Sequence, residues 1–251
     1  MDAQGSVEKA IDVLFHLHAE PTPCGVSEIG RALDMPKSSV HRLLASLVRR
    51  RLVERDDHGR YRPGVSLVAL GLGVLEREPS VMAARPVLEK LAAEVGETCF
   101  LVAARAGALI VLEKAEGTGF LRAAPQVGAS VPVHATAVGK LHLALAPDSL
   151  AGGPDDDLES FTAQTVTDPA ALDRAIEAVR AAGLAWSLDE WIAGLSVLAA
   201  PIRVGERLAA AIALALPSPA LASHDVAHLE DRVREAAAEI SGRLTGGAAR
   251  T

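Results

Sequence analysis

The 251-residue chain is poor in aromatic residues and cysteines, and no apolar run in it is long enough to cross a membrane. Aromatic side chains make up only 3% of the sequence, which argues against the base-stacking surfaces that bind single-stranded nucleic acids. Cys24 and Cys99 form no CxxC pair, so neither a disulfide framework nor a zinc site is expected. Because there is also no recognisable secretory leader, we expect a cytoplasmic protein with no metal, no cofactor and no membrane partner.

The charge of the chain is unevenly distributed. The formal net charge is -7, which by itself argues against a nucleic-acid partner. The segment from Lys37 to Arg62, however, contains eight Lys and Arg residues and only three Asp and Glu residues. A basic patch on an acidic protein is typical of a local duplex-binding surface, because the acidic remainder discourages indiscriminate contact with phosphates.

The N-terminal pattern of apolar residues predicts three helices and a hairpin. Apolar residues recur at helical spacing in three short segments, with Ser6 and Ser27 as candidate N-caps of the first two. Two β-like stretches follow, joined by a polar turn that ends in Gly59. The predicted helices span Ser6–His18, Ser27–Leu33 and Lys37–Arg50, and the predicted strands span Leu52–Arg55 and Arg60–Arg62.

The second and third helices have the residues that a helix-turn-helix requires. Pro36 stops the second helix from continuing, and Gly30 is small where the two helices are expected to cross closely. The residues expected to pack between the helices and in the turn are Ile29, Leu33, Met35, Val40 and Leu43. With the hairpin as a wing, the first part of the chain is predicted to be a winged helix-turn-helix.

The exposed face of the third helix is the candidate DNA-reading surface. In this motif the start of the helix enters the major groove, where long donors and hydroxyls reach base edges. Arg49 lies farther along and is better placed for phosphate, and the arginines of the hairpin would lie near the backbone or the minor groove. The candidate DNA-binding residues are Ser27, Lys37, Ser38, Ser39, His41, Arg42, Arg49, Arg60 and Arg62.

The rest of the chain interleaves helices with strands, which predicts an α+β fold. The predicted helices span Ser66–Glu78, Pro86–Val95, Thr136–Leu145, Asp168–Ala182 and His224–Leu244, and the predicted strands span Thr98–Ala104, Leu109–Lys114, Ser196–Arg203 and Leu208–Leu216. Because Pro79-Ser80 interrupts the pattern, the first of these helices is expected to be a linker. The predicted domains are a DNA-binding domain at 1–65, a linker helix at 66–79 and an effector-binding domain at 80–251.

Ordered motifs in both halves resemble the IclR family of bacterial regulators. In the first half the similar segments are Ser6-Val7-Glu8-Lys9-Ala10, Ser27-Glu28-Ile29, Met35-Pro36-Lys37-Ser38-Ser39-Val40-His41-Arg42-Leu43-Leu44 and Gly59-Arg60-Tyr61-Arg62-Pro63-Gly64. In the second half they are Pro132-Val133-His134-Ala135-Thr136-Ala137-Val138-Gly139-Lys140, Asp189-Glu190, Gly194 and Ala199-Ala200-Pro201. The resemblance implies a winged helix-turn-helix, a linker helix and a GAF-like effector-binding domain. It also implies homodimers or homotetramers on palindromic double-stranded operators of catabolic genes, and a small-molecule effector, commonly a carboxylate.

The resemblance also indicates an effector pocket. Backbone N–H groups at the start of the helix near Thr136 could hold a carboxylate. Family members that bind very small oxo-acids have an acidic residue, a cysteine and two serines where this chain has Ser187, Val197, Ala213 and Ala215. A very small anion would leave buried polar groups unpaired, so a larger apolar ligand such as an aromatic acid is expected, with Trp191 closing over it. The candidate effector-binding residues are Ala137, Val138, Ser187, Asp189, Trp191, Val197, Ala213 and Ala215.

The sequence therefore predicts a DNA-binding transcriptional regulator, more specifically a repressor of a catabolic operon that responds to a small organic acid. One alternative is an adaptor whose winged helix contacts a protein partner, which the basic third helix argues against. The other is a metabolic enzyme, but no nucleophile stands beside a base in a recognisable motif, and no enzyme is predicted. The enzyme alternative would have to use His134, Lys140, His142, Asp189 and Glu190 as its catalytic residues.

Overall fold

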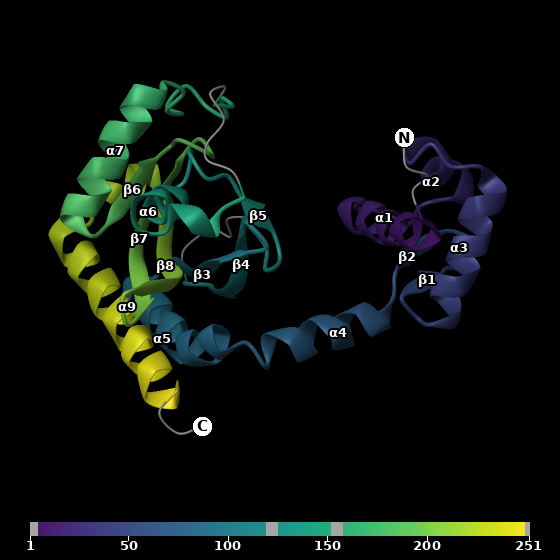
Figure 1. The fold of residues 1–251 in the computed structure, drawn as a ribbon, viewed down its shortest axis with the longest axis horizontal. Coiled ribbons are helices and arrows are strands. Elements are labelled where there is room, and N and C mark those ends of the chain that lie inside the picture. Colours follow the sequence, from purple (N-terminus) through teal and green to yellow (C-terminus); the bar gives the residue numbers. More distant parts are fainter. Residues whose placement is uncertain (1–4, 119–124, 152–157, 249–251) are drawn as a thin grey trace. The chain divides into compact units, whose positions relative to one another are not determined.

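The computed structural model describes residues 5–118, 125–151 and 158–248 (Figure 1). These residues form two compact units, one ending at Arg77 and the other beginning at Glu78. Each unit has its own apolar core. None of the helices in the described part of the chain is long and apolar enough to span a membrane.

The first unit packs three helices against a small hairpin, and a fourth helix follows. Its elements are α1 (Ser6–Ala19), α2 (Val26–Ala32), α3 (Lys37–Arg49), β1 (Val53–Arg55), β2 (Tyr61–Pro63) and α4 (Val65–Leu75). β1 and β2 pair antiparallel, and a bridge between Cys24 and Tyr61 ties the hairpin to the segment before α2. The predicted winged helix-turn-helix is confirmed, and α1 to β2 agree with the predicted bounds to within one residue.

The helix-turn-helix core follows the predicted spacing. Four of the five residues predicted to pack between α2 and α3 are buried, and Leu33 is half-buried. A Cβ at Gly30 would lie 2.8 Å from the Met35 carbonyl oxygen, and the Gly30 carbonyl accepts a hydrogen bond from the Met35 N–H at 2.8 Å. Only glycine allows the end of α2 to lie this close to the turn.

The predicted serine N-caps are wrong. Gly5 and Gly25 are the N-cap residues of α1 and α2, and Ser6 lies inside α1, while Ser27 is an exposed residue in the first turn of α2. The Gly25 N–H donates to Glu28 Oε2 at 2.9 Å. In α1 the Gly5 N–H donates in the same way to Glu8. The stabilising carboxylate therefore stands three residues after the cap, and it satisfies the backbone without a capping hydroxyl.

The second unit is a six-stranded antiparallel sheet with helices on both faces. Its elements are α5 (Pro79–Val95), β3 (Thr98–Arg105), β4 (Ala108–Ala115), β5 (Ser130–Val131), α6 (Ala137–Leu145), a 3-10 turn (Pro147–Ser149), α7 (Pro169–Ala182), β6 (Ala185–Leu188), β7 (Leu195–Val204), β8 (Arg207–Pro217), α8 (Ser218–Leu221) and α9 (Val226–Ala248). The strand order is β5-β4-β3-β8-β7-β6. Because β3 lies beside β8, chain segments far apart in sequence meet in the middle of the sheet.

The two faces of the sheet have different roles. α5 and α9 lie side by side and pack against β3, β4, β7 and β8 (Figure 1). α6 contacts β7 and β8, and α7 packs on α6. Phe100 and Val102 of β3 belong to the core that α6 shares with the sheet, whereas Leu101 between them points to the other face, as the alternation of strand side chains requires. The α6 face is therefore the one that can enclose a ligand.

The second unit differs from prediction in the start of α5 and in three short elements, β5, β6 and α8. The helix expected at Pro86 begins seven residues earlier, at Pro79, and Pro86 lies inside it. Pro79 occupies the first turn, where a missing N–H costs nothing, and the Glu78 side chain caps the helix by accepting hydrogen bonds from Ser80. The four-residue strand β6 was not predicted, because so short an edge strand carries almost no periodic signal.

Candidate DNA-binding surface and effector pocket

The first half of α3 presents polar and cationic side chains to solvent. Val40, with other apolar residues on the same side, fixes the helix on the core. This leaves the opposite side exposed: Lys37, Ser38, His41 and Arg42 are exposed, and Ser39 is half-buried. The first turn of α3 contains no acidic residue, so that its positive end and its cations have the same sign. This surface suits phosphates and the acceptor edges of bases.

The cationic end of α3 continues into the following turn. Arg49 is exposed in the last turn of the helix, and Arg50 and Arg51 after it are also exposed. They lie more than three helical turns from Lys37, which agrees with the expectation that they contact backbone rather than base edges. Their contact with DNA stays a prediction.

The two wing arginines make contacts that the sequence did not reveal. Arg60 donates to the Pro23 carbonyl oxygen at 2.6 Å and to both carboxylate oxygens of Glu28, the nearer at 2.8 Å. Arg62 pairs with Glu54 at 3.1 Å. The Gly25 N–H and then the Arg60 guanidinium lower the pKa of Glu28. Arg60 therefore joins the wing to the start of α2. To contact DNA as predicted, its guanidinium would have to bind a phosphate or a base in addition to Glu28 and Pro23, or in place of them.

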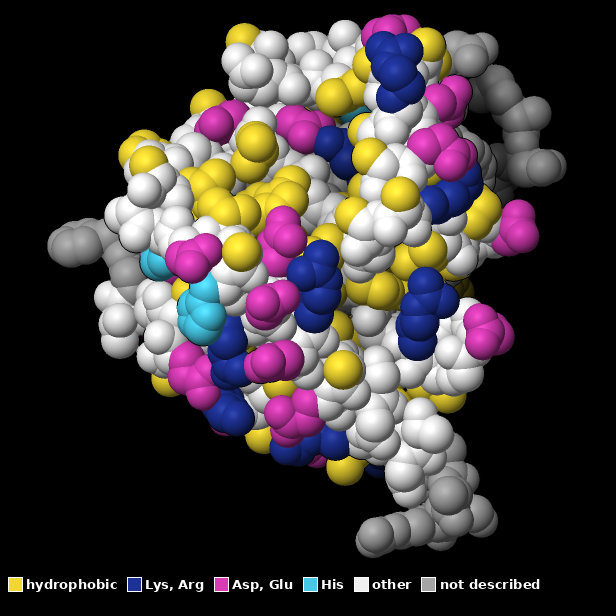
Figure 2. Space-filling view, turned by 90° about the vertical axis from the view of Figure 1, so that its left-hand side faces the viewer, with side chains coloured by type: hydrophobic (Ala, Val, Ile, Leu, Met, Phe, Trp, Pro, Cys, Tyr) yellow, Lys and Arg dark blue, Asp and Glu magenta, His cyan; other side chains and the backbone are white. Residues whose placement is uncertain are grey.

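One face of the second unit has mixed charge. On the face shown in Figure 2, positive and negative side chains are interspersed. Several are paired along the helices, as Arg180 with Glu177 in α7 and Arg243 with Glu239 in α9. Such a surface has little attraction for a polyanion, so the electrostatic case for DNA contact is concentrated on α3.

An inner chamber lies between α6 and the sheet. Its volume is about 40 Å³, and Thr136 supplies the one hydroxyl among its described lining residues. That hydroxyl donates to the Pro132 carbonyl oxygen at 2.6 Å and accepts the Gly139 N–H at 3.0 Å. The chamber is lined by Phe100, Val102, Pro125, Val131, Thr136, Val138, Trp191, Leu195, Val197, Ala213 and Ala215.

Five of the eight predicted effector-binding residues line this chamber: Val138, Trp191, Val197, Ala213 and Ala215. Sequence reasoning missed Phe100, Val102 and Leu195, because only the strand order β3-β8-β7 brings them beside the predicted residues. The remaining three predicted residues are Ala137, Ser187 and Asp189, and none of them is among the chamber's described lining residues.

Ser187 and Asp189 make internal hydrogen bonds instead. The Ser187 hydroxyl donates to the Ala135 carbonyl oxygen at 3.1 Å. Asp189 Oδ1 accepts from the Gly194 N–H at 2.6 Å and from the Ser218 hydroxyl at 2.8 Å. Ala137 is buried at the first position of α6. These contacts hold the walls around the chamber, and direct effector contact by the three residues stays a prediction.

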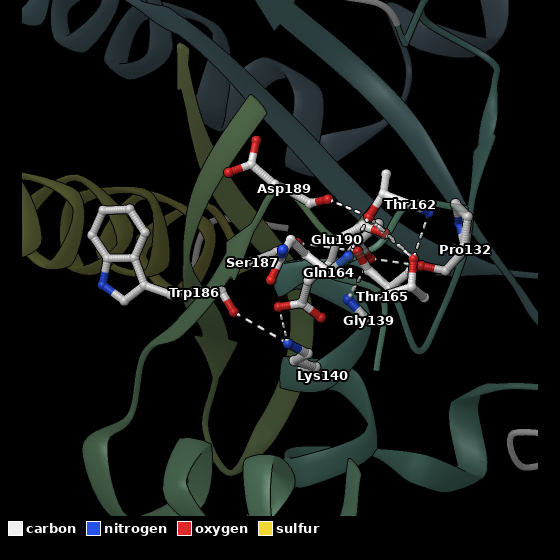
Figure 3. A network of polar contacts seen from close by, with 12 residues as sticks. Pro132, Gly139, Lys140, Thr162, Gln164, Thr165, Trp186, Ser187, Asp189 and Glu190 are labelled. Atoms are coloured by element: carbon white, nitrogen blue, oxygen red, sulfur yellow. Dashed lines mark hydrogen bonds and ion pairs between the residues drawn. The ribbon is translucent and has the colours of Figure 1, made fainter. Parts of the chain in front are cut away.

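A buried ion pair joins α6 to the loop after β6 (Figure 3). Lys140 Nζ pairs with Glu190 Oε1 and also lies 3.5 Å from the Trp186 carbonyl oxygen. Both residues are buried, and a buried pair of this kind is costly to break by removing one partner. The two residues, considered from the sequence as part of a catalytic set, are thus bound to each other.

The other members of the imagined catalytic set are also in structural contacts. His134 stacks on Phe161 with ring centroids 5.6 Å apart, and its Nε2 lies 2.8 Å from the Glu159 carbonyl oxygen. His142 is buried, and burial lowers its pKa. Within residues 5–118, 125–151 and 158–248, no group of three or more His, Cys, Asp or Glu side chains could hold a metal ion.

A winged helix with an exposed cationic helix, followed by a sheet that encloses a chamber, defines a DNA-binding regulator with a sensor domain. A family model described as the IclR helix-turn-helix domain matches residues 6–57, and one described as bacterial transcriptional regulator IclR C-terminal matches residues 73–242. The chain belongs to the IclR family of bacterial transcriptional regulators. The predicted family is confirmed, and so is the predicted fold, an α+β chain with a winged helix-turn-helix and a GAF-like effector domain.

Individual relatives agree with this assignment. The chain is 33% identical to the HTH-type transcriptional regulator BhcR of Paracoccus denitrificans, over 94% of this chain and 86% of that protein. It is 30% identical to the glycerol operon regulatory protein of Streptomyces griseus, over 96% and 97% of the two chains. The crystal structure of an IclR homolog from Microbacterium hydrocarbonoxydans, complexed with 4-hydroxybenzoate, matches with a TM-score of 0.82 at 25% identity, over 96% of this chain and 100% of that one. These relatives confirm that the chain is a transcriptional regulator, and they favour this function over the enzyme and adaptor alternatives. Regulators of this family bind DNA through the helix-turn-helix and an effector in the C-terminal domain.

Proposed function

We propose that this regulator is a cytoplasmic repressor of a catabolic operon and that a small organic acid with an apolar, preferably aromatic, body releases it from DNA. The observation that carries the proposal is the lining of the inner chamber. Apart from Thr136, the described lining residues have apolar side chains. A two- or three-carbon acid would find few hydrogen-bond partners there, whereas a ring would bury its surface against Phe100 and Trp191.

We propose the start of α6 as the site for the carboxylate of such a ligand. Val138, the second residue of this helix, lines the chamber, and Thr136 caps the helix through the Gly139 N–H. The N–H groups of the first turn lie at the positive end of the helix dipole, which favours an anion without a cationic side chain. The homolog from Microbacterium hydrocarbonoxydans, whose structure contains 4-hydroxybenzoate, supports this class of ligand.

The size of the chamber supports a role in signalling. A volume of about 40 Å³ holds little more than a water molecule, so an aromatic acid has to move the walls apart. A ligand that binds an opened state more tightly shifts the population toward that state. Displacement of α6 or of the sheet is therefore the proposed origin of the change that weakens DNA binding.

The preference for aromatic acids can be tested with the full chain. A fluorescently labelled duplex from the region upstream of the protein's own gene is bound, and benzoate, 4-hydroxybenzoate or pyruvate is added while anisotropy is followed. We expect the two aromatic acids to release the duplex at concentrations at which pyruvate has no effect. Release by pyruvate at lower concentrations than by either aromatic acid would contradict the proposal.

A variant with a filled chamber serves as the matched control. Ala213→Val places two methyl groups in the chamber from β8. We expect it to bind the duplex with unchanged affinity and to lose the response to aromatic acids, because added volume in a packed site displaces the ligand. A full response of this variant would show that the acids act elsewhere.

We also propose that the chain binds a palindromic operator as a homodimer, alone or paired into a homotetramer, through the exposed apolar residues of α1 and α4. Val7, Ile11 and Phe15 recur at every fourth position of α1, and the exposed fractions of Val7 and Phe15 are 70% and 69%. On α4 the exposed apolar residues are Val65, Val68, Leu70, Leu72 and Val74. Exposed apolar patches of this extent mark protein interfaces, and a second copy fits because a twofold operator requires a twofold protein.

Introducing charge into this surface should separate the dimer. The double variant Phe15→Glu, Val68→Glu is expected to sediment with half the mass of the parent at the same concentration, since a charge buried in an apolar interface is strongly disfavoured. Sedimentation velocity measures the mass, and Ala178→Glu on the exposed face of α7 is the control. A double variant with the parent's mass would refute this interface.

A further inference from the structure

An outer pocket borders the inner chamber. Its volume is about 460 Å³, more than ten times that of the chamber. Val131 and Trp191 line both spaces, so these are the two residues that the pockets share in the described part of the chain. The outer pocket is lined by Ser130, Val131, Pro132, Val133, His134, Leu158, Glu159, Phe161 and Trp191. Among the described residues, one aromatic and one aliphatic side chain therefore border both the outer pocket and the proposed effector site.

The walls of the outer pocket suit a flat ring. The His134 and Phe161 rings are stacked at an interplanar angle of 28°, and the contact of His134 Nε2 with the Glu159 carbonyl oxygen fixes the orientation of this pair. Trp191 adds a third ring to the lining. Planar ligands gain stacking and edge contacts with such rings in addition to simple burial.

The loop that carries Trp191 is anchored at the two residues before it, Asp189 and Glu190, which Figure 3 shows within their polar network. The side chain of Glu190 is held by Lys140 of α6. The Glu190 carbonyl oxygen accepts a hydrogen bond from the Thr165 hydroxyl at 2.6 Å. The Thr162 hydroxyl donates to the Asp189 carbonyl oxygen at 2.6 Å. The backbone entering Trp191 is thus fixed from two directions.

The loop is also closed on its far side. The Asp189 carboxylate holds the Gly194 N–H and the Ser218 hydroxyl, which ties the two ends of the loop to each other and to the start of α8. Among the described residues, by contrast, no hydrogen bond of the Trp191 indole is found, and Trp191 and Ile192 differ from their buried neighbour Glu190 in being partly exposed. The side chain of Trp191 can therefore rotate without breaking a hydrogen bond, while its backbone stays in place.

We propose that Trp191 is the gate of the effector chamber and that the outer pocket is an antechamber in which an aromatic acid first binds. The Lys140–Glu190 pair acts as the positioning element, because it fixes the backbone of the gate on α6. This inference rests on the proposed function in one respect: it takes the inner chamber to be the effector site. Rotation of Trp191 joins the two spaces, so that the ring of the ligand passes from the antechamber into the chamber.

The gate can be tested without knowing the effector. Ala213→Cys places a thiol in the inner chamber, and p-hydroxymercuribenzoate serves as a thiol-reactive aromatic acid. In the reaction a sulfur–mercury bond forms, and the thiol proton leaves with the mercury-bound hydroxide as water. The rate at which this introduced thiol is labelled in the full chain, called the chamber rate below, reports passage through the gate. We expect Trp191→Ala to raise the chamber rate about tenfold or more, because a gate of this kind is open for only a minor fraction of the time.

The native cysteines provide the internal control. Cys99 is fully buried, and burial raises the pKa of its thiol to about 12, so it reacts only when the domain opens as a whole. Each gate variant is therefore also labelled without Ala213→Cys, and this rate measures general opening of the domain. Leu188→Cys, at a position 47% exposed, gives the rate of a freely accessible thiol. Trp191→Phe, with a smaller ring, is expected to give a chamber rate between those of Trp191 and Trp191→Ala.

A second arm tests the positioning pair. Lys140→Met with Glu190→Leu replaces the ion pair by apolar side chains and leaves no charge buried alone. With Trp191 in place, the chamber rate should rise while labelling of Cys99 does not change. A chamber rate that is unchanged in Trp191→Ala, or that rises only in parallel with the labelling of Cys99, would overturn the gate. The chamber rate is measured without DNA, so the gate and the effector class are tested independently. If the gate is confirmed but aromatic acids do not release the duplex, only the proposed effector class is refuted.

Discussion

Replacing Arg42 by alanine is expected to weaken operator binding by about 1–3 kcal/mol, which corresponds to about 5- to 150-fold in Kd. Arg42 is exposed on the first half of α3, on the side opposite the buried Val40. In the described residues its guanidinium pairs with no acidic side chain, whereas Arg60 and Arg62 have Glu28 and Glu54 as partners. Its hydrogen-bonding groups are therefore free for a base or a phosphate.

The loss should affect binding alone. Because Arg42 makes no contribution to the core, the melting temperature of Arg42→Ala should equal that of the parent. Fluorescence anisotropy with the upstream duplex measures Kd, and Arg174→Ala, an exposed arginine of α7 with a side chain 72% exposed, controls for the loss of one positive charge. Equal affinity of Arg42→Ala and the parent would remove this residue from the interface.

The largest effect on stability is expected for Gly139→Ala. A Cβ at Gly139 would lie 1.7 Å from the Val133 carbonyl oxygen and 2.4 Å from the Val133 carbonyl carbon. Backbone atoms cannot move aside as a flexible side chain can, so the start of α6 would have to move away from the Val133 backbone. We expect a loss of about 4 kcal/mol or more, which is a large part of the stability of a typical domain.

Thermal or urea unfolding of the full chain measures this loss, with the transition of each unit followed separately. Gly242→Ala is the matched control, because a Cβ at this helical position of α9 meets nothing within 4 Å. Alanine there should stabilise the helix by about 0.5–1 kcal/mol. If Gly139→Ala unfolded at the same denaturant concentration as the parent, the close approach at the start of α6 would be disproved.

The DNA-binding unit could be predicted from the sequence because its determinants are local. The spacing of Ile29, Val40 and Leu43 around a proline turn defines the helix pair within fifteen residues, and α1 to β2 follow the predicted bounds. The role of Arg60 could not be found in this way, since its partner Glu28 lies 32 residues earlier. A long cation in a wing gives the same sequence signal whether it contacts DNA or the protein.

The inner chamber shows the same limit more strongly. The family resemblance located the positions of Val197 and Ala213, and both line the chamber, while their contact with an effector stays a prediction. Phe100 was missed, because its place depends on the pairing of β3 with β8 across more than a hundred residues. The Lys140–Glu190 pair spans 50 residues and appeared in the sequence only as two separate charges.

The salt dependence of duplex binding tests the central claim most directly, namely that the cations of α3 contact DNA phosphates and bases. The anisotropy titration of the parent chain is repeated from low to moderate salt and compared with Arg42→Ala. If several phosphates are contacted, affinity should fall by about a thousandfold between roughly 50 and 200 mM salt, and a variant that loses one phosphate contact should show a slope smaller by about one. Binding that does not change with salt, or no binding to the duplex at any salt concentration, would contradict the account.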